Sequence, residues 1–286
     1  MESRSEEQED IFPLNEVCDG TSILSDYLAS FLKNSRYANS QDDKRVLFYR
    51  GQSNAQYKLT PSVFRKGLLS KEHQLISDIM LESPEEFVGI HSSLERLIKM
   101  QHYGLPTRLI DVTFNPLVAL YFACCSNKDC DGEIITFYDY LVNPTDLNVR
   151  CLSEISEYYG STERQMLGFL SERGISNPEL VTITSKTHIP IRVQMNNERI
   201  RRQRGLFVIV GIHGESGVNP FQKVEFDLKE FVVKDYGDGI PRSTIIRKED
   251  KSIIMQELDA LGINQGFLFP EFEHQAQYIR QKFEEE

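Results

Sequence analysis

The chain has 286 residues, of which 40% are hydrophobic and 10% aromatic, with no tryptophan. This apolar content is enough for a buried core, and the length fits one α+β domain. A formal net charge of -11 argues against broad binding to a phosphate backbone, which needs clustered lysine and arginine, although it leaves room for a small basic pocket.

Three local signals concern the compartment of the chain. No apolar run is long enough to cross a bilayer as a helix, so a membrane is not expected as a partner. The start of the sequence is acidic and lacks the apolar stretch of a signal peptide. The cysteines include no CxxC pair, and Cys124 and Cys125 lie in an apolar stretch that favours reduced, buried thiols. We therefore expect a cytoplasmic protein.

The first part of the chain contains a helix signal and then a strand signal. Residues 1–12 are charged and are expected to form a flexible acidic N-terminus. Apolar residues at helical spacing from Ile23 to Leu32 predict an amphipathic helix, and the polar residues 34–43 predict its end. Residues 46–49 predict a short strand that Arg50-Gly51-Gln52 closes.

The middle of the chain continues this alternation. Residues 70–100 predict helix, interrupted near Ser83-Pro84 and ended by Gly104 and Pro106. Residues 108–112 predict a strand, and Asn115-Pro116 opens a helix with proline in its first turn. A further strand is predicted over residues 132–138 and helix over 145–175.

The last part of the chain has shorter elements. Strands are predicted at 189–193, 206–212 and 242–247, with a basic helix at 196–203 and two closing helices at 249–261 and 271–283. No repeat, linker or change of composition divides the sequence, so residues 13–286 are expected to form a single domain. Its predicted class is α+β, with a small split sheet, mixed or antiparallel, that is flanked by helices.

Three segments carry residues that suit chemistry. The first is Arg50-Gly51-Gln52, where a guanidinium at a strand end can grip a carboxylate or phosphate with two hydrogen bonds while the glycine lets backbone approach the ligand. The alternative is an ordinary strand-end ion pair followed by a turn glycine. Taken alone, these residues favour the ion pair.

The second segment runs from Gln101 to Thr113 and is rich in polar residues for a loop and strand beside an apolar helix. His102 could act in acid–base chemistry or bond a ligand hydroxyl, or it could cap the preceding helix. Asp111 lies in an apolar strand and would need a partner if buried, which Arg108 or Arg50 could supply.

The third segment, Glu198 to Phe207, concentrates four arginines in an acidic chain. This cluster could contact nucleic acid, but it lacks interleaved aromatic residues, and a solvated helix face with Glu198 paired to Arg202 explains it better. The sequence has no phosphate-binding glycine loop, no GxGxxG, no GxSxG and no metal-ligand spacing, which excludes kinase, Rossmann, serine-hydrolase and zinc-enzyme functions.

Together the three segments resemble the FRG domain, a bacterial and phage family named for a Phe-x-Arg-Gly motif. That motif is Phe48-Tyr49-Arg50-Gly51 here, extended by Gln52. The resemblance continues through residues 101–113, 115–116 and 119–123, resumes at 199–207, and ends at Leu268-Phe269-Pro270-Glu271.

A weaker resemblance is to the ADP-ribosyltransferase fold, which holds NAD with three strand-borne elements. It implies that Arg50 grips the pyrophosphate or a ribose, that Thr113 leads from the second strand into a helix, and that Gln203 takes the third position. The catalytic residues it implies are Arg50, His102, Asp111 and Gln203. The NAD contacts it implies come from Tyr49, Gly51, Gln52, Tyr103, Thr107, Arg108 and Thr113.

The third position departs from the family's pattern. A glutamate there normally stabilises the oxocarbenium-like centre, and a glutamine does so less, so either Asp111 supplies the negative charge or turnover is absent. The implied function is an NAD-using ADP-ribosyltransferase-like effector or toxin in bacterial or phage conflict. The alternative is a non-catalytic sensor of a nucleotide or nucleic acid, in which Arg50, Arg108 and the arginine cluster grip phosphates.

Overall fold

The computed structural model describes residues 23–41, 43–160, 162–175, 188–194, 197–211, 227–234 and 237–284. Residues 1–12, predicted to be a flexible N-terminus, lie outside them. Within the described part, six strands form one sheet in the order β4-β5-β2-β1-β3-β6, and all neighbouring strands are antiparallel. The strands are β1 (Val46–Gln52), β2 (Leu109–Thr113), β3 (Gly132–Asp139), β4 (His188–Ile191), β5 (Gly205–Val210) and β6 (Ser243–Ile246).

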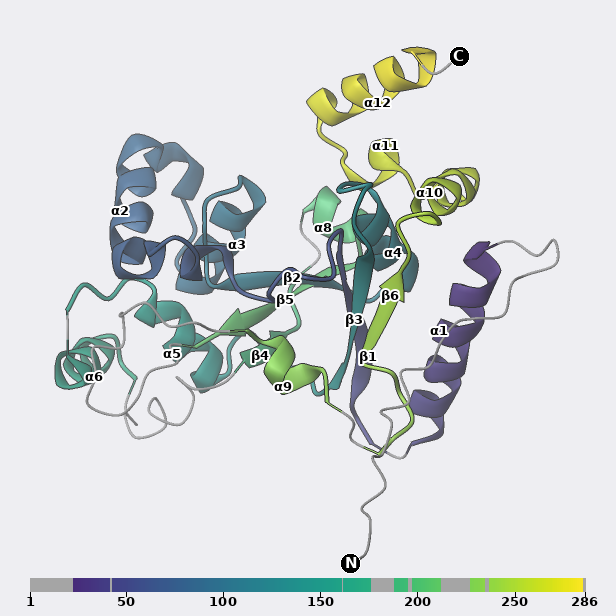
Figure 1. Cartoon of the computed structure of the whole chain (residues 1–286). Coiled ribbons are helices and arrows are strands. Elements are labelled where there is room, and N and C mark those ends of the chain that lie inside the picture. Colours follow the sequence, from purple (N-terminus) through teal and green to yellow (C-terminus); the bar gives the residue numbers. More distant parts are fainter. Residues whose placement is uncertain are drawn as a thin grey trace, which may run out of the picture.

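Helices surround this sheet, which confirms the predicted α+β class (Figure 1). The α-helices are α1 (Ile23–Ser40), α2 (Glu72–Glu82), α3 (Ser93–His102), α4 (Pro116–Cys124), α5 (Leu147–Ile155), α6 (Glu163–Glu172), α8 (Glu198–Arg202), α9 (Lys229–Val232), α10 (Lys251–Ala260), α11 (Gln265–Leu268) and α12 (Phe272–Glu284). Short 3-10 turns are η1 (Ser62–Phe64), η2 (Leu68–Lys71) and η3 (Pro84–Phe87). No helix of the described ranges is long and apolar enough to span a membrane.

The sheet is split, as predicted. Strand β1 pairs with β3 along its whole length, and β2 pairs with β5 along its whole length. By contrast, β1 and β2 are in register only at Tyr49 and Thr113. In Figure 1, β1 and β3 run across the direction of β2 and β5, so the two halves of the sheet diverge from this single junction.

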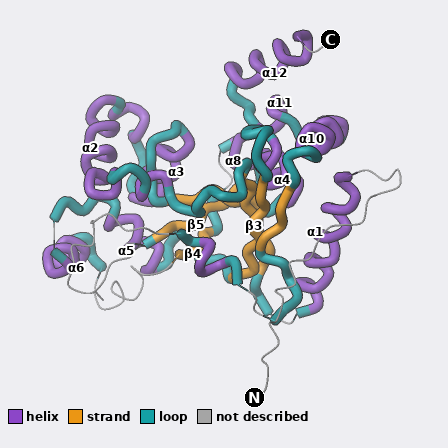
Figure 2. The backbone as a smooth tube through the Cα atoms, in the orientation of Figure 1, coloured by secondary structure: helices purple, strands orange, loops and turns teal. Residues whose placement is uncertain are grey.

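Three apolar cores fill the space around the sheet. One face of the central strands, with Phe48 and Ile110, packs on η1, η2 and α9. On the other face, α1, α4 and α10 cover the β1–β3–β6 half, whereas α3, α5 and α6 cover the β2–β5–β4 half. In Figure 2 the first of these groups lies to the right of the strands and the second to the left. The junction of β1 and β2 therefore lies between two separately packed halves.

Two predicted boundaries and one predicted burial were wrong. Helix α1 runs through the expected polar break to Ser40, because Asn34 is buried on its inner face, while Leu32 is exposed. The helix predicted over 145–175 is divided into α5 and α6. Cys125 is exposed rather than buried, since it caps the end of α4 beyond the core, whereas Cys124 is buried as expected.

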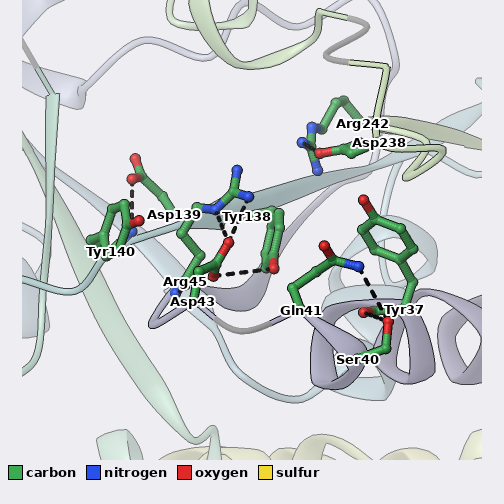
Figure 3. Close-up of polar contacts among 10 residues, drawn as sticks. All are labelled: Tyr37, Ser40, Gln41, Asp43, Arg45, Tyr138, Asp139, Tyr140, Asp238 and Arg242. Carbon is green, nitrogen blue, oxygen red and sulfur yellow. Dashed lines mark hydrogen bonds and ion pairs between the residues drawn. The ribbon is translucent and has the colours of Figure 1, made fainter.

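A polar cluster closes the turn between α1 and β1 (Figure 3). Arg45 forms an ion pair with Asp43 at 2.6 Å, and its guanidinium carbon lies 4.3 Å from the centre of the Tyr138 ring. The Tyr138 hydroxyl donates to the Asp43 carboxylate at 3.3 Å. These contacts tie the residue before β1 to the end of β3.

Candidate functional site

Arg50 lies where β1 and β2 diverge. Its Nη1 donates a 2.6 Å hydrogen bond to the backbone carbonyl of Asp111 on β2, just past the only paired residues of the two strands. The two strands separate at this point, so the Asp111 carbonyl has no backbone donor from β1. The Arg50 guanidinium supplies the hydrogen bond instead. The Arg50 Nε is buried without a hydrogen-bond partner in the described residues. Burial lowers the pKa of Arg50, the charge of Asp111 raises it, and the charge of Arg65 lowers it further. The guanidinium nevertheless remains charged at any physiological pH.

The Asp111 side chain is exposed, and a chain of hydrogen bonds fixes its orientation. The Leu109 amide donates to the Thr107 hydroxyl oxygen at 3.2 Å, so that hydroxyl gives its proton to Gln101 Oε1 at 2.6 Å. The Gln101 amide nitrogen is then directed at Asp111 Oδ2, 2.8 Å away. Because each donor is assigned in turn, the Asp111 carboxylate accepts the hydrogen bond from Gln101.

His102 ends α3, directly after the Gln101 that bonds this carboxylate. Gly104, with φ of 84°, reverses the chain directly after the helix and leaves the His102 ring facing the C-terminal segment. Its Nε2 lies 3.7 Å from Glu271 Oε1. Burial lowers the pKa of His102 and Arg199 adds to this, while Glu271 and Asp111 act in the opposite direction. The imidazole is therefore neutral at neutral pH and can accept a proton.

Glu271 is a site residue that the sequence reasoning missed. It joins α11 to α12, and its Oε1 also lies 4.0 Å from Arg199 Nη1. Its Oε2 is buried and has no hydrogen-bond partner in the described part of the chain. The Arg199 guanidinium carbon lies 4.8 Å from the centre of the Phe269 ring, which orients the segment before Glu271. The only sequence signal was the Leu268-Phe269-Pro270-Glu271 stretch of the resemblance.

Gln203 fastens this C-terminal segment to β2. Its side-chain nitrogen donates to the Leu268 carbonyl at 3.1 Å, and its own carbonyl accepts from the Thr113 hydroxyl at 2.6 Å. Arg202 adds a 3.2 Å hydrogen bond to the Phe267 carbonyl. The amide of Gln203 is thus engaged in positioning the segment that carries Glu271.

The four residues expected to be catalytic therefore gather around β2. Arg50 donates to the Asp111 carbonyl, His102 directly follows the Gln101 that bonds the Asp111 carboxylate, and Gln203 is joined to the end of β2 through Thr113. What the arrangement adds is the carboxylate of Glu271 next to His102. Glu271 brings a carboxylate to the imidazole of His102 and the guanidinium of Arg199, a combination that suits proton transfer and the binding of a charged, hydroxyl-bearing ligand.

The residues expected to contact NAD are placed differently. Tyr103 is open to solvent, with 71% of its surface exposed. The others lie largely inside: Tyr49, Gln52, Thr107, Arg108 and Thr113 are buried. Burial raises the pKa of Tyr49 to about 12, and Arg108 is wholly enclosed in an ion pair with Glu72. In this structure these side chains support the site, and their contact with a ligand stays a prediction.

Part of the chain matches a known family. A family model described as the FRG domain matches residues 45–132. The chain carries an FRG domain. The matched region runs from the residue before β1 to the first residue of β3, and it contains Arg50, His102 and Asp111. Neither the curated proteins nor the solved structures include a match to the chain.

Each signature residue of the FRG domain has a distinct place. The Phe48 ring stacks on Phe137 at 4.8 Å in the core, and Arg50 bridges the split to β2. Gly51 lies under α4, where a Cβ would come within 1.8 Å of the Ala119 carbonyl oxygen. The glycine is therefore explained by close packing of α4 on the strand, in place of the expected backbone approach to a ligand.

The electrostatics of the FRG-domain site give a direct prediction. Replacing Arg199→Gln removes a positive charge that disfavours imidazolium, so the pKa of His102 should rise. NMR titration of the imidazole measures this shift. Arg201→Gln is the matched control, because Arg201 is exposed and pairs with Glu198, and it should leave the titration unchanged. A His102 pKa that is unchanged or lower in Arg199→Gln would contradict the placement of Arg199 near His102.

The same shift affects stability. The folded state holds the pKa of His102 below its unfolded value of about 6.5, so protonation favours the unfolded chain. This contribution to stability is present above about pH 6.5 and is lost as the pH falls below it.

Proposed function

We propose that this FRG-domain protein is an ADP-ribosyltransferase-like enzyme that binds NAD at the split of the sheet and releases nicotinamide. The observation that carries the proposal is the Glu271 carboxylate, 3.7 Å from the imidazole of His102, which directly follows the Gln101 that bonds the Asp111 carboxylate. This pair of carboxylates provides the negative charge that Gln203 cannot supply. On the FRG resemblance, we further propose a role as an effector or toxin in bacterial or phage conflict.

The chemistry assigns a role to each group. The bond between ribose C1′ and the nicotinamide nitrogen breaks, its electron pair leaves with nicotinamide, and positive charge develops on the ribose. Asp111 and Glu271 stabilise that charge. Water or an acceptor group then bonds to C1′, and neutral His102 takes the proton that the attacking atom loses. The charged guanidinium of Arg50 binds the phosphates.

The arginine cluster gives less support to a nucleic-acid sensor. Arg202 pairs with Glu198 at 2.9 Å and bonds the Phe267 carbonyl, while Arg199 is directed at Glu271 and Phe269. Their charge is thus largely used within the chain, which leaves little for a phosphate backbone. A nucleotide sensor would give a different result from an enzyme: NAD would bind, but nicotinamide would not be released.

The proposal predicts that Glu271→Gln lowers the rate of nicotinamide release about a hundredfold, because an amide cannot offset the developing charge. Release from labelled NAD is followed in the presence of cell extract, which supplies acceptors. Since Gln keeps the shape of Glu, the melting temperature should change little. Glu273→Gln, an exposed position in α12, is the matched control and should retain the full rate.

Two results would count against the enzyme. If wild-type protein neither binds nor consumes NAD, the proposed ligand is wrong. If NAD binds but nicotinamide is never released, the site is that of a sensor, and the catalytic roles of His102, Asp111 and Glu271 fall.

A further inference from the structure

Helix α12 has one face that the described chain does not cover. Its inner face is anchored: the Tyr278 hydroxyl donates to Asp259 at 2.8 Å, and Gln275 bonds the Phe269 carbonyl at 3.0 Å. The Tyr278 ring also packs directly on Gly266. In Figure 1 the helix extends beyond α10 and α11, away from the sheet. Contacts with α10 and α11 thus hold one side of the helix, and its other side faces solvent.

The outer face carries an apolar stripe. Phe272, Ile279 and Phe283 are 88%, 54% and 73% exposed, and Ala276 is exposed between them. Their spacing of four, three and four residues is that of the a and d positions of a coiled coil, which form a narrow seam for one partner helix. Large exposed side chains aligned in this way mark an interaction surface rather than scattered surface apolar residues.

We propose that this seam joins two copies of the chain through antiparallel pairing of their α12 helices. About a twofold axis between Ala276 and Ile279, Phe272 of one copy meets Phe283 of the other, and Ala276 meets Ile279. Large side chains therefore oppose one another at both ends, and a small one opposes a large one at the centre.

Charge selects a second copy in this orientation. Glu273 and Arg280 each follow a d position, so they flank the seam on one side. In the antiparallel pair, Glu273 of each copy lies beside Arg280 of the other, giving two complementary contacts. In a parallel pair, neither Glu273 nor Arg280 would face a side chain of opposite charge. Arg280 already forms a 3.2 Å ion pair with Glu284, but this pair is mostly exposed and leaves the guanidinium accessible to a second copy.

The interface is small, so the dimer should be weak and dependent on concentration, with a dissociation constant on the order of micromolar or higher. Sedimentation velocity of the full chain, from micromolar to sub-millimolar concentration, should show a shift from monomer to dimer. Ile279→Ser with Phe283→Ser should abolish the dimer without lowering the melting temperature. Leu81→Ser, which removes a 76% exposed side chain on α2, should leave it intact.

Charge exchange tests the orientation. Glu273→Arg and Arg280→Glu alone should each weaken the dimer roughly tenfold, because each creates two like-charge contacts, and the double variant should restore it. A monomer at all concentrations would overturn the proposal. So would a dimer that is indifferent to the Ile279 and Phe283 changes, or a double variant no better than the singles.

Discussion

Gly51→Ala should leave little or no folded protein. A Cβ at this position would stand 1.8 Å from the Ala119 carbonyl oxygen and 2.8 Å from the Ala123 amide nitrogen, both backbone atoms of α4. Neither atom can move by a side-chain rotation, and Ala119 and Ala123 are fully buried, so the whole helix would have to shift. We expect a cost of about 4 kcal/mol or more, which is a large part of the roughly 5–15 kcal/mol that stabilises a typical domain.

Urea denaturation and soluble yield measure this effect. The matched control is Gly168→Ala in α6, where a Cβ would meet nothing within 4 Å. Alanine favours helix over glycine by about 0.5–1 kcal/mol, so this variant should be as stable as wild type or slightly more so. A Gly51→Ala protein with wild-type stability would show that α4 does not pack on β1 as described.

Arg108→Met should also destabilise the fold strongly. Arg108 and Glu72 form an ion pair in which the two side chains are 0% and 3% exposed, with Arg108 Nε 3.0 Å from Glu72 Oε1. Burial raises the pKa of Glu72 while Arg108 acts to lower it, so removal of the arginine leaves a carboxyl group that is costly to ionise. Breaking one side of such a pair costs about 3–5 kcal/mol.

The double variant Arg108→Met with Glu72→Leu should recover much of this loss, because no buried charge is left unpaired. Arg45→Met provides the contrast, since its ion pair with Asp43 is 34% and 23% exposed and should contribute about 1 kcal/mol or less. If the double variant remains as unstable as Arg108→Met, the pair is not the source of the effect.

The sequence was most informative where structure is local. Asn115-Pro116 predicted the start of α4, and the structure shows the Asn115 side chain accepting from the Leu117 amide at 3.0 Å. Helix α1 was too short in the prediction, because the pattern of polarity cannot show that Asn34 faces inward. Periodicity specifies which residues are apolar on a face, and tertiary packing decides where that face ends.

The candidate site was only partly predictable. The resemblance grouped Arg50, His102, Asp111 and Gln203, which the fold brings together around β2. It could not show that Glu271, far along the chain, lies beside His102, because that contact depends on the packing of α11 and α8. Nor could it distinguish buried Arg108 from an arginine that faces a ligand, since both roles need the same residue type.

Hydrogen–deuterium exchange with NAD tests the central claim most directly. The full chain would be compared alone and with an NAD analogue in which carbon replaces the ribose ring oxygen, so that cleavage is blocked. We expect slower exchange in residues 101–113, in α8 and in the Leu268–Glu271 segment, with no change in α2 or α6. Protection confined to other regions, or none with the analogue in large excess, would contradict a nucleotide site at the split of the sheet.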